Sequence, residues 1–134
     1  MHHLARKVSC TLAGLLAIFP TSGFAAISSI DLTGYTLTGT YALPATLAEE
    51  ASAVTYNWTS DTLFVLGDEG EALVEVSKTG TMISSITLTD FDDTEGLTYL
   101  GGNQFVVTEE RLRDAYLLNY TSGSTVARGS LLLS

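Results

Sequence analysis

The feature that most constrains the fold of this chain is an internal repeat with a period of about 43 residues. Residues 53–56 align with residues 96–99, and the alignment continues through three further segments of each repeat. It pairs residues 63–65 with 104–106, 73–76 with 116–119, and 85–88 with 130–133. Every segment is rich in Val, Leu, Ile, Thr, Tyr or Phe and is bounded by Gly, Asn, Asp or Ser, which predicts four short β-strands in each repeat.

We expect an all-β chain, because no stretch shows sustained helical periodicity. Short connections with Gly, Asn, Asp and Ser favour antiparallel hairpins and leave no room for long parallel crossovers. The expected strands are Tyr35–Tyr41, Ala53–Tyr56, Thr62–Leu66, Ala72–Val76, Met82–Thr87, Leu97–Tyr99, Gln104–Thr108, Ala115–Tyr120 and Val126–Leu132.

A repeat of roughly 40–50 residues with four strands is typical of a β-propeller blade, because one four-stranded sheet must stack on neighbours to bury both faces. We therefore predict a partial propeller over residues 26–134. About two four-stranded blades are present and the other blades are missing beyond the C-terminus, since a closed ring needs typically four to eight. The strand Tyr35–Tyr41 is expected to complete the last blade. The alternative is a sandwich of about seven to nine strands whose hairpins resemble one another.

Residues 1–25 have the pattern of a secretory signal peptide. Arg6 and Lys7 form a basic start, an apolar stretch runs from Leu12 to Phe19, and Gly23 and Ala25 are the small residues expected before a cleavage site. The alternative is an uncleaved membrane anchor, for which the apolar stretch is short of the roughly 20 residues that span a bilayer. We expect export to the periplasm, the cell envelope or the extracellular space.

The charge of the mature chain limits its partners. Two of the six basic residues are removed with the signal peptide. The remaining four basic and 15 acidic residues give the mature chain a net charge of −11. This charge repels phosphate backbones, so we expect no nucleic-acid partner and look for a cation instead. Cys10, His2 and His3 also lie in the signal. The mature chain therefore has no disulfide, no zinc thiolate site and no histidine-dependent triad.

Acidic residues gather at two places in the second half of the chain. Residues 90–96 carry four carboxylates within six residues, and residues 108–114 follow an expected strand. Side chains two apart in an extended chain share a face, which predicts that Asp93 and Glu95 point together. Hard oxygen ligands suit calcium, so the candidate metal ligands are Asp93, Glu95, Glu109 and Asp92, with no catalytic residue assigned. The alternatives are a solvated acidic loop and an ordinary charged hairpin loop.

Residues 91–100 and 105–111, with the paired motifs Asp-Asp-Thr-Glu-Gly and Thr-Glu-Glu-Arg, resemble the SdiA-regulated family of bacterial propellers. The resemblance covers roughly residues 37–134. It implies a propeller that is six-bladed when complete, related to NHL-repeat proteins and exported or held at the cell envelope. It further implies a calcium site and leaves the biochemical activity open.

A looser similarity links Glu95-Gly96 to lactonase-type and phytase-like esterase propellers, in which an acid followed by glycine opens an inner strand and binds a metal. Ser52 stands at the corresponding position one repeat earlier, which favours a specific site at Glu95. We favour a noncatalytic module that binds calcium and an unknown protein or small-molecule ligand. The rival is a calcium-dependent hydrolase, although these residues show no base beyond the carboxylates. A purely structural role without an ion is the third possibility.

Overall fold

The computed structural model describes residues 31–68 and 71–130. The expected signal peptide, residues 1–25, lies outside these ranges. The chain divides into two units, Met1–Thr36 and Leu37–Ser134. The described part of the first unit contains the short 3-10 turn η1 (Leu32–Gly34), whose start is capped by the Asp31 side chain. None of the described residues belongs to a helix that is long and apolar enough to cross a membrane.

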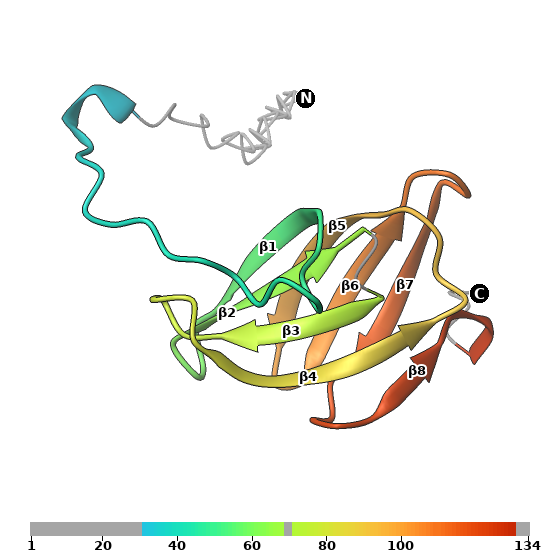
Figure 1. Cartoon of the computed structure of the whole chain (residues 1–134). Coiled ribbons are helices and arrows are strands. Elements are labelled where there is room, and N and C mark those ends of the chain that lie inside the picture. Colours follow the sequence, from blue (N-terminus) through green and yellow to red (C-terminus); the bar gives the residue numbers. More distant parts are fainter. Residues whose placement is uncertain (1–30, 69–70, 131–134) are drawn as a thin grey trace, which may run out of the picture. The chain divides into compact units, whose positions relative to one another are not determined.

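The described part of the second unit is all-β, as predicted, and contains two sheets (Figure 1). The five-stranded sheet has the order β1 (Ala51–Asn57), β2 (Thr62–Gly67), β3 (Ala72–Val76), β4 (Met82–Thr89), β8 (Thr125–Ala127). The three-stranded sheet has the order β5 (Thr94–Gly101), β6 (Gln104–Glu109), β7 (Asp114–Asn119).

Antiparallel hairpins join β1 to β4 in succession and β5 to β7 in succession. Strand β6 shows why these segments form strands: Phe105 and Val107 are buried, whereas Val106 between them is only partly buried and the flanking Gln104 and Thr108 are exposed. This period of two gives the strand one apolar face. The turn into β6 passes through Gly102, whose φ of +61° lies in the left-handed region that glycine adopts without steric cost.

The main core lies between the two sheets, which face each other. The rings of Phe64 on β2 and Phe105 on β6 lie 4.5 Å apart between centroids. These two residues are equivalent in the sequence repeat, so both repeats turn the same face of their second strand towards one core. The other fully buried core members are Leu66, Leu73, Ile86, Leu88, Val107 and Leu118.

A second, smaller core covers the outer face of the five-stranded sheet. Val65, Val74 and Val76 are buried there together with Ala48 from the segment that precedes β1. That segment lies so close that a Cβ added at Gly67 would collide with the carbonyl oxygen of Glu49. The central strands β2 and β3 are therefore packed on both faces, which explains why they are apolar almost throughout.

Two expected strands differ in the structure. Residues 35–41 form no strand within the described part of the chain, and Tyr35 and Leu37 are largely exposed. Their β-forming composition does not suffice without a strand edge to pair with and a core to pack on.

The segment expected as Val126–Leu132 is the second difference. Strand β8 is short, ends at Ala127 and continues into the 3-10 turn η2 (Arg128–Ser130), while residues 131–134 lie outside the described residues. It pairs in parallel with β4 and not with β7. The preceding turn is tied to β4, because Gly123 donates to Ser85 O and Thr87 donates to Ser124 O. Within residues 94–130, the second repeat thus forms a three-stranded sheet and not the expected four-stranded blade.

Candidate functional site

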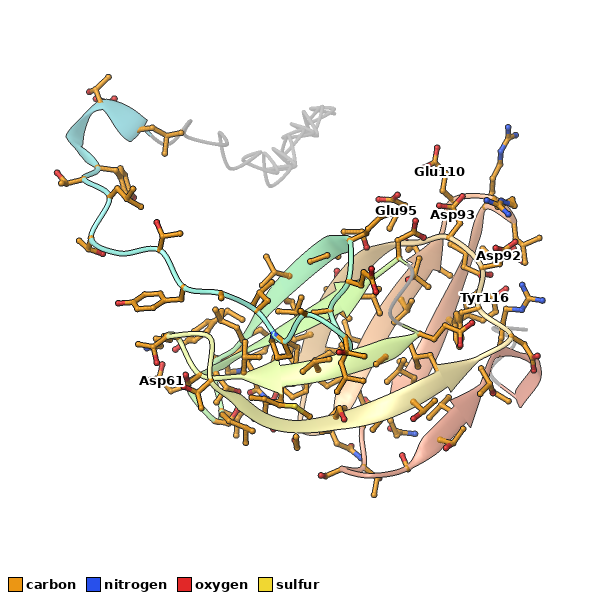
Figure 2. The ribbon with its side chains drawn as sticks, in the orientation of Figure 1. Asp61, Asp92, Asp93, Glu95, Glu110 and Tyr116 are labelled. Atoms are coloured by element: carbon orange, nitrogen blue, oxygen red, sulfur yellow. The ribbon has the colours of Figure 1, made fainter. Side chains whose placement is uncertain are left out.

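Three carboxylates meet at one end of the second unit (Figure 2). Asp93 precedes β5, Glu95 lies within β5, and Glu110 directly follows β6. Each offers one oxygen, and these three oxygens lie within 4.8 Å of one another. Asp93 is partly buried, whereas Glu95 and Glu110 are exposed. We call these three residues the acidic triad.

The pairing of β5 with β6 brings the triad together. Thr94 is the register partner of Glu109, so the residues that flank this pair lie at the same sheet end. The backbone N–H of Glu110 donates to the carbonyl oxygen of Asp93 at 3.0 Å, which fixes the loop against the end of β6. Asp93 has a φ of +87°, a left-handed conformation that Asp adopts more readily than most residues.

Gly96 allows the two strands to approach at this end. A Cβ at this position would collide with Oγ1 of Thr108 on the facing strand β6. The Glu95-Gly96 pair therefore combines a carboxylate at the start of β5 with the close strand contact that places it beside Glu110.

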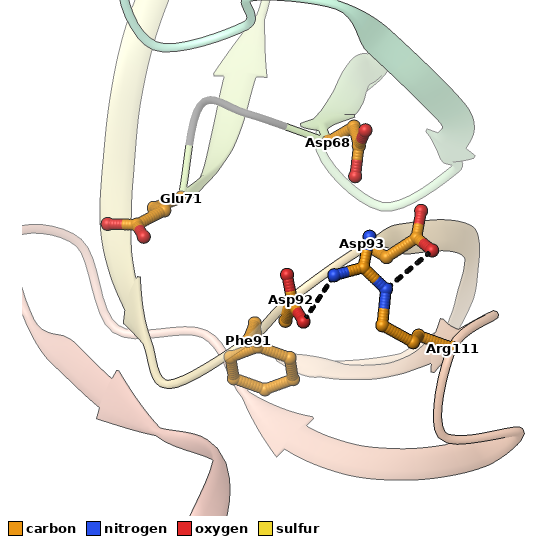
Figure 3. Close-up of a pocket in the computed structure, with 6 residues that line it drawn as sticks. All are labelled: Asp68, Glu71, Phe91, Asp92, Asp93 and Arg111. Atoms are coloured by element: carbon orange, nitrogen blue, oxygen red, sulfur yellow. Dashed lines mark hydrogen bonds and ion pairs between the residues drawn. The ribbon is translucent and has the colours of Figure 1, made fainter.

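The guanidinium of Arg111 lies next to Asp93 of the acidic triad (Figure 3). Nη1 of Arg111 is 2.8 Å from Oδ2 of Asp92, and its Nε is 3.6 Å from Oδ2 of Asp93. Both partners line a small pocket of about 90 Å³, together with Asp68, Glu71, Phe91 and Arg111 itself. The side chains of Arg111 and Asp92 are mostly exposed, so their pairing is screened by solvent and contributes little stability.

Glu109 points to the opposite side of β6 and is buried. Its side chain has 0 % exposure, and Oε2 is 3.2 Å from Nη1 of Arg128 in η2. Its Oε1 accepts the backbone N–H of Asp92. The pKa of the Arg128 guanidinium is raised because the Glu109 carboxylate accepts its hydrogen bond. The nearby phenol of Tyr116 has a raised pKa, chiefly because of burial.

The structure thus separates the four residues predicted as metal ligands. Asp93 and Glu95 come together, whereas the carboxylate of Asp92 pairs with Arg111 and that of Glu109 with Arg128. The third member of the triad is Glu110, which the sequence reasoning did not select. The signal was present in β6: Phe105 and Val107 alternate inward, so the next inward position is Glu109 and its neighbour points out.

A second charged cluster lies at the turn between β1 and β2, where Asp61 is labelled far from the triad in Figure 2. Asp61 accepts a hydrogen bond from the hydroxyl of Tyr56 and forms an ion pair with Lys78. The Lys78 hydrogen bond is the main cause of a lowered pKa of Asp61, and the same contact raises the pKa of Lys78. This cluster carries as many cations as carboxylates.

Comparison with known protein families gives a match over most of the chain. The model of the SdiA-regulated family matches residues 28–131, which include all eight strands of the described structure.

Proposed function

The chain belongs to the SdiA-regulated family, and from this membership together with the acidic triad we propose that it is a calcium-binding part of an exported β-propeller that recognises a ligand. The single observation that carries the proposal is the meeting of three carboxylate oxygens within 4.8 Å.

The propeller architecture has support from the sequence repeat and from the placement of β1 and β5. Oγ of Ser52 on β1 donates to the carbonyl oxygen of Thr94 on β5 at 2.6 Å, so the first strands of the two repeats lie side by side. First strands of successive blades are neighbours around the axis of a propeller. In the complete six-bladed ring, we propose that the segment after β7 pairs with β7 and forms the fourth strand of the second blade.

The chemistry of the triad favours calcium. Carboxylates held this close repel one another unless a cation lies between them, and hard oxygen donors suit Ca²⁺. Three carboxylates supply only part of the six to eight oxygens that Ca²⁺ takes. Because Glu95 and Glu110 are exposed, water or an oxygen of a bound partner has access to the remaining positions.

We propose a binding role in preference to catalysis because the exposed Glu95 and Glu110 leave coordination positions open to a ligand. An ion with exposed coordination positions can hold a carboxylate, hydroxyl or phosphate oxygen of a ligand without any further group. A hydrolase would use the ion to polarise an oxygen and activate water. Chelator-sensitive turnover of lactones or phosphate esters would establish the hydrolase instead.

Titration calorimetry of the purified protein with CaCl2 tests the site. Wild type is expected to bind Ca²⁺, and Glu95→Gln and Glu110→Gln are each expected to weaken binding by about tenfold or more, since the number of charged ligands sets affinity. Glu49→Gln is the control, because it removes an exposed carboxylate outside the triad. Absence of binding by wild type, or equal affinities in all four proteins, would refute the proposal.

A further inference from the structure

An ion pair between the buried Glu109 and the partly exposed Arg128 connects the acidic end of the second unit to the turn η2. Glu109 is among the largest fully buried side chains of the described residues, and its charged partner there is Arg128. Arg128 directly follows β8, which is held to β4 by the pairs Leu88 with Val126 and Thr89 with Ala127. The position of the guanidinium is therefore set by the main fold.

The same carboxylate holds the loop that carries Asp93. Two hydrogen bonds join this loop to the end of β6: Asp92 N–H donates to Glu109 Oε1, and Glu110 N–H donates to Asp93 O. The first of them depends on where the Glu109 side chain lies. One oxygen of Glu109 thus contacts the loop and the other contacts Arg128.

We propose that Glu109 and Arg128 are positioning residues that hold Asp93 beside Glu95 and Glu110, an inference that rests on the function proposed above for the acidic triad. Glu109 acts through the backbone of Asp92, while its neighbour Glu110 offers an oxygen to the ion. The adjacent acids of the Thr-Glu-Glu-Arg motif therefore have different tasks, one inside the fold and one outside.

The physical basis is the cost of a buried charge without its partner. Removal of Arg128 leaves the Glu109 carboxylate buried and uncompensated, so it must gain water by opening its surroundings. Asp90 and Tyr116 also lie near the guanidinium, but neither supplies a positive charge to replace it. We expect residues 92–93 to open, since they follow the buried Phe91, belong to no strand, and contact Glu109 through the single Asp92 N–H bond.

Amide hydrogen exchange followed by NMR, in metal-free buffer, tests the positioning role. In Arg128→Gln the amides of Asp92 and Glu110 are expected to exchange about tenfold faster or more. The Asp92 N–H loses its carboxylate acceptor on Glu109, and the Glu110 N–H loses the Asp93 carbonyl when the loop opens. The amide of Leu118, in the core strand β7, serves as the reference for global stability. Arg113→Gln, at an exposed arginine of the β6–β7 turn, is the charge-matched control.

Equal acceleration at Leu118 would reduce Arg128 to a general stabilising residue, and unchanged exchange at Asp92 would overturn the inference. If Arg128→Gln does not fold, Arg128→Lys decides the question, because it keeps the charge. Arg128→Lys is then expected to speed exchange at Asp92 and Glu110 by a smaller factor without affecting Leu118. If exchange at Asp92 and Glu110 stays unchanged in this variant, the proposal is contradicted.

A calcium titration of the same variants separates this inference from the proposed function. Weaker binding in Arg128→Gln with an unchanged number of ions is expected for a positioning residue. If wild type binds no calcium, the proposed function fails, while the exchange data still decide whether Glu109 and Arg128 hold the loop.

Discussion

The two charged clusters of the second unit differ in how their carboxylates are balanced. At the β1–β2 turn, Asp61 is met by the ammonium of Lys78 and by the hydroxyl of Tyr56. At the beginning of β5 and the end of β6, the three carboxylates of the acidic triad share the neighbourhood of Arg111, which is also paired with Asp92.

This difference separates a charged cluster that is complete from one that has room for a further cation. The Asp61 cluster has its counter-charge from within the chain, so an added ion gains little there. The triad has an excess of negative charge, and like charges at short range destabilise the folded chain until a cation neutralises them. Charge balance, and not the number of acids, thus identifies the candidate site.

The largest effect is expected from neutralising the whole triad. The variant Asp93→Asn, Glu95→Gln, Glu110→Gln should lose the increase in Tm that calcium gives wild type, because a ligand that binds the folded state stabilises it by mass action. In metal-free buffer the same variant should melt at a higher temperature than wild type, because the repulsion is gone. Differential scanning calorimetry with calcium and with chelator measures both.

The control for this experiment is Asp61→Asn in the balanced cluster. It should leave the calcium response intact and lower Tm slightly in metal-free buffer, because it removes an ion pair. A triple variant that still responds to calcium, or that is less stable without it, would erase the contrast between the two clusters.

A smaller effect is expected from the arginine that borders the triad. Arg111→Gln should tighten calcium binding by a few-fold, since an exposed ion pair worth about 0–1 kcal/mol no longer competes for Asp93. Calorimetric titration beside Arg113→Gln separates this local effect from the general change in net charge. Weaker binding in Arg111→Gln would mean that the guanidinium supports the site and does not compete with the ion.

The smallest effect is expected from pH at the Asp61 cluster. Because the folded state lowers the pKa of Asp61, the contact adds stability above the ordinary pKa of the carboxyl, and this stability is lost as pH falls through the lowered value. The difference in Tm between wild type and Lys78→Gln should therefore stay constant above the ordinary Asp pKa of 3.8 and shrink as pH falls below it. If the Tm difference between wild type and Lys78→Gln grows on acidification, the pKa of Asp61 is not lowered in the folded state.

The strands from β1 to β7 could be predicted because local patterns specify them. Apolar alternation and turn residues such as Gly80 and Gly102 act within a few residues, and the expected bounds of β3 agree with the observed ones. Strand β8 and residues 35–41 depend on which distant edge is available for pairing. That information is not local, and composition alone predicted strands that were longer or absent.

The candidate site was only partly predictable for a related reason. The spacing of two residues predicted that Asp93 and Glu95 point together, and their carboxylates do lie close to each other. To decide whether Glu109 or Glu110 is the metal-ligand candidate, one must know which residues of β6 point inward. One must also know that Arg128, from the distant turn η2, pairs with Glu109. Spacing within a motif does not reveal such a partner.

The most direct test of calcium binding at the triad is an NMR titration of the protein with CaCl2. The backbone amides of Asp93, Glu95 and Glu110 should shift first and saturate together, while the amide of Asp61 stays in place, because the ion binds where carboxylates outnumber the cationic side chains beside them. Amide positions that remain unchanged at the triad, or that shift equally at Asp61, would contradict a calcium site at this end of the molecule.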